Sequence, residues 1–130
     1  MIDQETPCEH EHVPLHAAAS WLPERRELEI AAEMFRALAD PLRLRLLSRL
    51  AEGDACVSEL AALEGDKLTT ISARLKALHG VRLVRRRRDA KHVMYALADE
   101  HALLLVRSAI DHAMERVLPT SAAITKETRK

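Results

Sequence analysis

Aromatic residues are scarce in this sequence. They make up 2% of the 130 residues, as Trp21, Phe35 and Tyr95, whereas 48% of the residues are hydrophobic. A chain of this kind must build its core from aliphatic side chains, chiefly leucine and alanine, which favour helices. The length suits one small domain. The composition therefore predicts a single, mainly α-helical domain.

The sequence also lacks segments that direct a chain to a membrane. Its first residues, MIDQETPCEHEH, are acidic and contain neither a basic region nor an apolar run, unlike a secretory signal. No stretch is apolar over the length that spans a bilayer. We therefore expect a cytoplasmic protein with no membrane partner. In that compartment Cys8 and Cys56 would be free thiols or metal ligands rather than a disulfide.

Net charge is absent, but charge is unevenly distributed. The 20 basic and 20 acidic residues cancel over the whole chain. Residues 67–95, however, contain nine basic residues and one acidic residue (+8), and residues 1–40 contain three basic and nine acidic residues (−6). A compact basic segment is typical of a surface that contacts a nucleic-acid backbone. Zero net charge therefore does not exclude DNA as a partner.

Only three glycines occur, and each falls where a helical pattern ends. Residues 1–23 are rich in proline and lack periodicity, so we interpret them as a flexible arm. The apolar spacing predicts a folded domain over 24–118 with five helices, and a disordered tail over 119–130. These helices cover about 24–39, 41–52, 57–63, 67–79 and 99–118, with Asp40 and Asp66 as N-caps of the second and fourth.

The segment 81–97 alternates apolar and polar residues on either side of a turn near Asp89-Ala90, which predicts a β-hairpin. Two short helices joined at Gly65 precede it, as in a helix-turn-helix. In the second of them Leu68, Ile71, Leu75 and Leu78 are expected to face inward. The fold class predicted is mainly α with a small β-hairpin: a winged helix-turn-helix of order α-α-α-α-β-β-α that forms a homodimer.

A DNA-binding surface is predicted where the fourth helix meets the hairpin. Small, hydroxyl and basic side chains would face the major groove, and the arginine-rich hairpin would contact phosphates. The expected groove residues are Thr69, Thr70, Ser72, Arg74 and Lys76, and the expected phosphate contacts are Arg85, Arg86, Arg87, Arg88 and Lys91. The alternative interpretation is a solvated hairpin whose charges only protect a sheet edge.

The fifth helix carries a second group of candidate residues. It is apolar on more than one side, which favours pairing with the same helix of a second chain. His101 and His112 share one face but lie roughly 16 Å apart along the axis at ~1.5 Å per residue, too far for one ion. Antiparallel pairing would instead bring Asp99 and His101 of one chain to His112 and Glu115 of the other, giving two Zn(II) sites per dimer. Exposed polar residues with no ligand are the alternative.

A third group combines thiols and imidazoles. Cys8, His10 and His12 lie in the arm, and an arm that folds back could reach Cys56 at the start of the third helix. This donor set suits Zn(II), Cd(II) or Cu(I). Incidental histidines in a disordered arm, with Cys56 as a small buried side chain, remain the alternative.

From about Phe35 to Glu115 the chain resembles the ArsR/SmtB metalloregulators. The resemblance rests on ALADPLRLRLLSRL, ACVSELA, TTISARLKAL followed by LVRRRRDAKHVMYAL, and DEH…DHAMERV. It implies a winged-helix homodimer that represses efflux or metallothionein-type genes and releases operator DNA when metal binds. It also implies that Asp99, His101, His112 and Glu115 are the regulatory ligands, with Cys8, His10, His12 and Cys56 as a second site. Where many members have Ser-His in the fourth helix, this chain has Ser72-Ala73.

The sequence thus predicts a metal-responsive transcriptional repressor and not an enzyme. Four ligands at the helix interface would close the coordination shell of the ion, and no phosphate-binding glycine loop is present, which disfavours a zinc enzyme. A metal-storage protein would not need the basic hairpin. The alternative within regulation is a redox-responsive repressor that uses Cys8 and Cys56.

Overall fold

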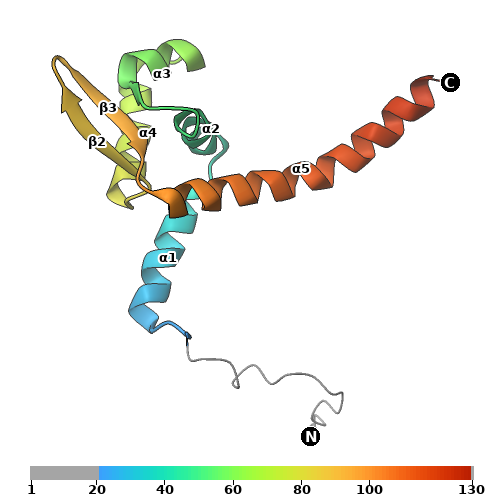
Figure 1. The fold of residues 1–130 in the computed structure, drawn as a ribbon, viewed down its shortest axis with the longest axis horizontal. Helices are drawn as coiled ribbons and strands as arrows, with labels where there is room; N and C mark the ends of the chain where they lie inside the picture. The colour runs from blue at the N-terminus through green and yellow to red at the C-terminus, as the bar shows by residue number, and fades with distance from the viewer. Residues whose placement is uncertain (1–20, 130) are drawn as a thin grey trace, which may run out of the picture.

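The structure is a computed structural model that describes residues 21–129, with side chains as far as Val117. Figure 1 shows α2, α3 and α4 gathered beside a small sheet, with α1 and α5 extending away from them. The elements, in chain order, are α1 Arg25–Leu38, α2 Pro41–Leu50, β1 Ala55–Cys56, α3 Val57–Glu64, α4 Leu68–Gly80, β2 Val84–Asp89, β3 His92–Leu97 and α5 Glu100–Arg129.

The expected fold class is confirmed, with one strand added. The antiparallel sheet has the order β1-β3-β2, so the expected hairpin of β2 and β3 gains β1 on its free edge. In the register of the hairpin Asp89 lies opposite His92, which leaves Ala90 and Lys91 as the turn. The turn therefore lies where the sequence placed it.

Local sequence signals set the starts of the first two helices. Glu24 and Glu27 form a capping box at the start of α1. At α2 the Asp40 carboxylate accepts a hydrogen bond from the Leu42 N–H at 3.4 Å, and Pro41 occupies the first turn, where its missing N–H has no helical partner. Both helices therefore begin as predicted.

The core is aliphatic and centres on α2, α3 and α4. Its fully buried side chains come from these helices and from the entry to β2, and Tyr95 is the one buried aromatic side chain among the described residues. The largest of them are Leu46, Leu47, Leu60, Ile71, Leu75, Leu78, Leu83 and Val84. Burying one such side chain stabilises a fold by about 1.5–3 kcal/mol. This core fixes α4 against α3 and the sheet.

The start of α4 differs from the expectation. Leu68 was expected to face inward, but it is the first residue of the helix and its side chain is 55% exposed. Asp66 was expected to cap the helix, whereas the residue at the N-cap position is Lys67, which makes no side-chain capping bond. Asp66 instead accepts a hydrogen bond from Arg74 at 2.9 Å. Asp66 therefore forms an ion pair with Arg74 in place of the expected cap of α4.

The end of α5 also differs. The sequence placed the end of this helix at Leu118 and a disordered tail over 119–130, whereas the backbone is helical to Arg129. The residues after Pro119 include the good helix formers Ala122, Ala123, Lys126 and Glu127, which favour a helix that continues past the proline.

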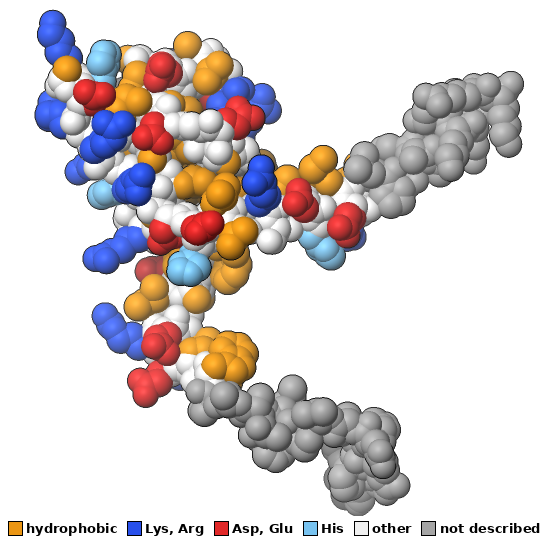
Figure 2. Space-filling model, viewed as in Figure 1, with side chains coloured by type: hydrophobic (Ala, Val, Ile, Leu, Met, Phe, Trp, Pro, Cys, Tyr) orange, Lys and Arg blue, Asp and Glu red, His pale blue; other side chains and the backbone are white. Residues whose placement is uncertain are grey.

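The two long helices expose apolar side chains. Leu28 and Phe35 of α1 and Leu104, Met114 and Val117 of α5 are each at least half exposed, and Figure 2 shows hydrophobic atoms along both helices. No helix in the described part of the chain is long and apolar enough to cross a membrane.

Candidate nucleic-acid interface and metal centre

α3 and α4 form the helix-turn-helix. Gly65 ends α3 with φ +68°, a left-handed conformation that glycine adopts without steric cost. On α4, Ile71, Leu75 and Leu78 face the core, and the opposite side of the helix faces solvent. Thr69, Ala73 and Lys76 are exposed there, and Thr70 and Ser72 are half-buried. The structure thus brings these candidate groove residues onto one accessible helix.

Arg74 behaves differently from the other groove candidates. Its Nη1 donates to Asp66 Oδ2 at 2.9 Å, and its side chain is only 20% exposed. The pair ties the loop before α4 to the middle of the helix. In this structure Arg74 therefore positions the loop before the helix, and its guanidinium does not extend toward solvent.

The arginines of β2 fall into two groups. Arg85 donates to the Ala98 carbonyl at 3.4 Å, and Arg87 pairs with Asp54 at 3.4 Å and with Asp89 at 3.7 Å. Arg86 and Arg88 are exposed and make no ion pair within the described residues. Figure 2 shows Lys and Arg side chains on the side where Figure 1 has the hairpin.

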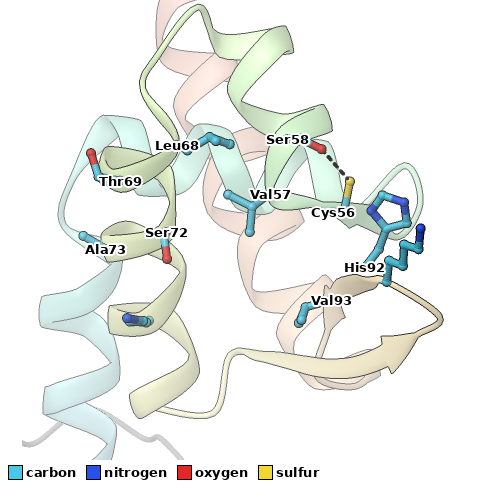
Figure 3. A pocket seen from close by; sticks show the side chains of 11 residues that line it. Cys56, Val57, Ser58, Leu68, Thr69, Ser72, Ala73, His92 and Val93 are labelled. Atoms are coloured by element: carbon cyan, nitrogen blue, oxygen red, sulfur yellow. Dashed lines mark hydrogen bonds between the residues drawn. The ribbon is translucent and has the colours of Figure 1, made fainter.

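A pocket of about 640 Å³ opens between α4, the start of α3 and the turn of the hairpin. We call it the wing pocket. Figure 3 shows that residues of α4, such as Thr69 and Ser72, and residues of the hairpin, His92 and Val93, line it. Its wall consists of Cys56, Val57, Ser58, Leu68, Thr69, Ser72, Ala73, Lys76, Lys91, His92 and Val93. This pocket could not be predicted, because it depends on how far the hairpin stands from α4 in the folded protein.

The four interface-ligand candidates are exposed at the start and in the middle of α5. Asp99 precedes the helix, and its Oδ1 accepts a hydrogen bond from the Ala102 N–H at 2.9 Å, which fixes the carboxylate and leaves Oδ2 free to bind a cation. His101, His112 and Glu115 lie along the helix. Within the described residues of one chain no three His, Cys, Asp or Glu side chains cluster as a metal site.

Asp99 is also close to the hairpin along the chain. β3 ends at Leu97, two residues before Asp99. The intervening Ala98 donates from its N–H to the Leu83 carbonyl at 3.0 Å and accepts from Arg85 through its own carbonyl. A short hydrogen-bonded junction thus joins the start of α5 to both strands of the hairpin.

Of the thiol and imidazole candidates, Cys8, His10 and His12 lie outside the described residues. Cys56 is described, and it is a buried free thiol. It ends β1 and is the N-cap residue of α3, where its Sγ contacts Ser58 Oγ at 3.2 Å. Its N–H donates to Glu59 at 2.9 Å; this bond, followed by the bond from the thiol, holds the pKa of Glu59 below its usual value.

Glu64 forms an ion-pair cluster that links α3 to α2. It pairs with Arg49 and, at 3.0 Å, with Arg45, and its side chain is 6% exposed. Burial raises the pKa of Glu64, but the hydrogen bonds from Arg49 and Arg45 outweigh burial and keep the pKa below its usual value. The carboxylate therefore stays charged and fixes the first helix of the helix-turn-helix to the core.

Comparison with known proteins agrees with this architecture. Residues 40–86 match the family model described as "Bacterial regulatory protein, arsR family". A transcriptional repressor SmtB homolog from Synechocystis is 41% identical over 111 residues, which cover 83% of this chain and 84% of that protein.

Solved structures share the fold. The homodimeric winged helix-turn-helix DNA-binding domain of Mb0332 from Mycobacterium bovis, described as a possible ArsR-family regulator, has a TM-score of 0.67 at 34% identity, covering 74% of this chain and 91% of that one. The antimony-specific repressor AntR has a TM-score of 0.67 at 27% identity, covering 84% of this chain and 99% of that one. The chain therefore belongs to the ArsR family of bacterial transcription regulators, which are DNA-binding proteins and not enzymes.

Proposed function

We propose that this regulator is a metal-responsive repressor. It binds operator DNA as a homodimer and releases it when Zn(II) or a similar ion binds between the α5 helices of the two chains, which derepresses genes for metal efflux or sequestration. One observation carries the proposal. Asp99, immediately before α5, and His101, His112 and Glu115 along the helix are all exposed, so a second chain could reach each of them.

A second copy of the chain would complete the site. An antiparallel α5 would bring the Asp99 and His101 end of one helix to the His112 and Glu115 segment of the other, giving four N and O ligands for each ion. The exposed apolar side chains of α1 and α5 supply the surface for this pairing. The Mycobacterium bovis relative is itself described as homodimeric.

The DNA surface would be α4 together with the hairpin. Thr69, Ser72 and Lys76 would reach base edges, and the exposed Arg86 and Arg88 would reach phosphates. In a symmetric dimer two copies of α4 would enter successive major grooves, so the relative orientation of the subunits controls affinity. The same proposal extends to Thr70, Lys91, Arg85 and Arg87 as further contacts at the edge of this surface.

Release would follow from linkage between metal and DNA. An ion that binds better to the DNA-free arrangement lowers DNA affinity by the same coupling free energy, typically ~1–3 kcal/mol. Asp99 is two residues from the end of β3, so a shift of α5 on metal binding reaches the hairpin through Ala98. The SmtB homolog, which is similar in sequence, is described as a transcriptional repressor, and AntR, which is similar in fold, is described as an antimony-specific transcriptional repressor.

The experiment that tests this proposal compares ligand and control variants on one operator. We expect His112→Ala and His101→Ala to bind DNA as the wild type does when no metal is present, but to remain bound when Zn(II) is added, in a fluorescence-anisotropy titration. Asp111→Asn is the matched control, because Asp111 is the exposed neighbour of His112 and is not in the ligand set. Cys8→Ser is expected to release DNA normally on Zn(II).

Two outcomes would contradict the proposal. Zn(II)-driven release by the His112 variant would show that the interface residues are not the sensor. Loss of release in Cys8→Ser alone would assign zinc sensing to the thiol group of Cys8, His10, His12 and Cys56 instead. Sedimentation at micromolar concentration that gives only monomer would remove the basis for a shared site.

A further inference from the structure

The wing pocket combines apolar side chains with positive charge. Its volume of about 640 Å³ lies within the range of about 300–1,000 Å³ that is usual for small-molecule sites. Two lysines, one histidine and three hydroxyl side chains line it, all of which can donate hydrogen bonds, and none of its described lining residues is acidic. We propose that the wing pocket binds a small organic anion with an apolar body, such as an aromatic carboxylate, and that the bound anion excludes DNA.

Apolar side chains from three elements line the pocket. Val57 begins α3, Leu68 begins α4 and Val93 lies in β3. Figure 3 shows α4 on one side of the space and the hairpin on the other, with Val57 between them. Leu68 is 55% exposed, although an aliphatic side chain of this size gains free energy when it is covered. A ligand with an apolar body would cover this exposed surface.

The positive charge of the pocket is not neutralised by the described residues. Lys76 of α4 and Lys91 of the hairpin turn are exposed and form no ion pair within this part of the chain. Arg88, which is also exposed, lies opposite Val93 in the register, so it shares the face of the hairpin that lines the pocket. Clefts lined by charges of one sign concentrate the electrostatic field and attract ligands of the opposite sign. An anion is therefore the ligand that this charge favours.

Three acidic residues lie close in sequence to the pocket, and each engages another group. Asp66, before α4, pairs with Arg74 at 2.9 Å. Glu59 of α3 accepts a hydrogen bond from the Cys56 N–H at 2.9 Å. Asp89 pairs at 3.7 Å with an arginine of its own strand. These carboxylates do not line the pocket, so the two lysines are available to a carboxylate that enters from solvent.

A bound anion would occupy space that DNA needs, and this consequence rests on the proposed function. Thr69, Ser72 and Lys76 are proposed base contacts, and Lys91 is a proposed phosphate contact; all four line the pocket. None of the described residues that line it belongs to α1 or α5, so the anion and the metal ion would act at separate places. The regulator would then have two inputs: a metal ion that changes the relation of the subunits, and an anion that blocks the operator-binding surface directly.

The test is an NMR titration of the isotope-labelled full chain with β-naphthoate at constant ionic strength, with β-naphthamide as the uncharged probe of the same shape. We expect saturable shifts of the amide signals of α4 and the hairpin, with a Kd of about 1 mM, because a ligand of this size gains little free energy per atom in an open pocket. β-Naphthamide should bind about 5-fold more weakly or worse, since it lacks the charge that the lysines attract.

Variants separate the charged contacts from the apolar ones. Lys76→Gln and Lys91→Gln should each raise the Kd for naphthoate by about 2–5-fold and leave the Kd for naphthamide unchanged. Leu68→Ala should raise both Kd values by about 3–10-fold, because it removes apolar contact. Lys67→Gln and Leu63→Ala are the matched controls and should change neither Kd, because both side chains are exposed and neither lines the pocket. Circular dichroism checks that each variant is folded.

Three results would overturn the site. The first is the absence of saturable naphthoate binding to the wild type at concentrations up to about 10 mM. The second is a set of shifts confined to α1 and α5, whose exposed apolar side chains are another surface on which an apolar anion could bind. The third is an equal Kd for naphthoate and naphthamide, because the lysines would then play no part.

Competition with operator DNA is measured by fluorescence anisotropy without metal. At a naphthoate concentration about ten times its own Kd, the apparent Kd for DNA should rise about 11-fold if binding is mutually exclusive. Shifts in the pocket without this rise would support the site and overturn the competition, and they would show that DNA does not cover the pocket. Failure of zinc-driven release would leave these results unchanged, because the pocket and the α5 ligand set share no residue.

Discussion

Arg86 offers the most direct test of the hairpin as a DNA-contact element. Its side chain is exposed and makes no ion pair within the described residues, so its charge is available to a phosphate. Arg86→Ala in a dimer removes one such contact from each wing. Each phosphate contact contributes about 0.9 to the slope of log K against log salt, so the slope should become shallower by about 2.

The assay is fluorescence anisotropy between about 50 and 200 mM salt, a range over which such contacts dominate the affinity change. The operator and an unrelated duplex should lose affinity alike, because phosphate contacts are not sequence-specific. Arg87→Ala is the matched control on the same strand. Arg87 already pairs with Asp54 and Asp89, so its replacement should change the slope less. An unchanged slope in Arg86→Ala, or a larger change in Arg87→Ala, would refute this account of the hairpin.

Three further predictions concern stability and specificity. Leu75→Ala should lower the free energy of unfolding by about 2–5 kcal/mol in chemical denaturation, because Leu75 is fully buried. Leu68→Ala should lower it by under about 1 kcal/mol, because Leu68 is 55% exposed. Equal losses of stability would contradict the packing described. Glu64→Gln should destabilise the fold by about 1–2 kcal/mol at neutral pH. The pKa of Glu64 is lowered in the folded state, so its contribution to stability is present above pH 4.5 and is lost as the pH falls through the folded pKa. Plots of unfolding free energy against pH for the variant and the wild type should therefore converge in acid. Parallel plots would show that the ion pairs contribute nothing. Asp66→Asn should free Arg74 to contact DNA and change the ranking of operator variants in a competition assay, and an unchanged ranking would show that the pair does not limit specificity.

The parts of the fold that depend on residues close together in the sequence were predictable. The Asp40-Pro41 start of α2 and the end of α3 at Gly65 are signalled within a few residues. β1 was not predictable, because a two-residue strand shows no alternation and exists only by pairing with β3. The spacing of Leu68 from Ile71 and Leu75 matched an inward stripe, but a residue in the first turn extends beyond the core that buries the rest of the helix.

The candidate sites also combine features that the sequence predicts with features that depend on tertiary structure. Spacing along α5 indicates that His101 and His112 of one chain are too far apart to share an ion, so the α5 ligand set stays a prediction that needs a second chain. The sequence could not show that Asp66 would engage Arg74, because that pairing depends on the conformation of the loop between α3 and α4.

The junction at Ala98 has a consequence for how such regulators diversify. α5 joins the hairpin through two residues, and its exposed ligand positions contribute no side chain to the wing pocket or to α4. In the proposed mechanism α5 senses the ion and α4 reads the operator, so substitutions along α5 would exchange one ion for another without altering the operator sequence that is read. By the same proposal, replacing the outward residues of α4 would direct the protein to a new promoter and leave its inducer the same.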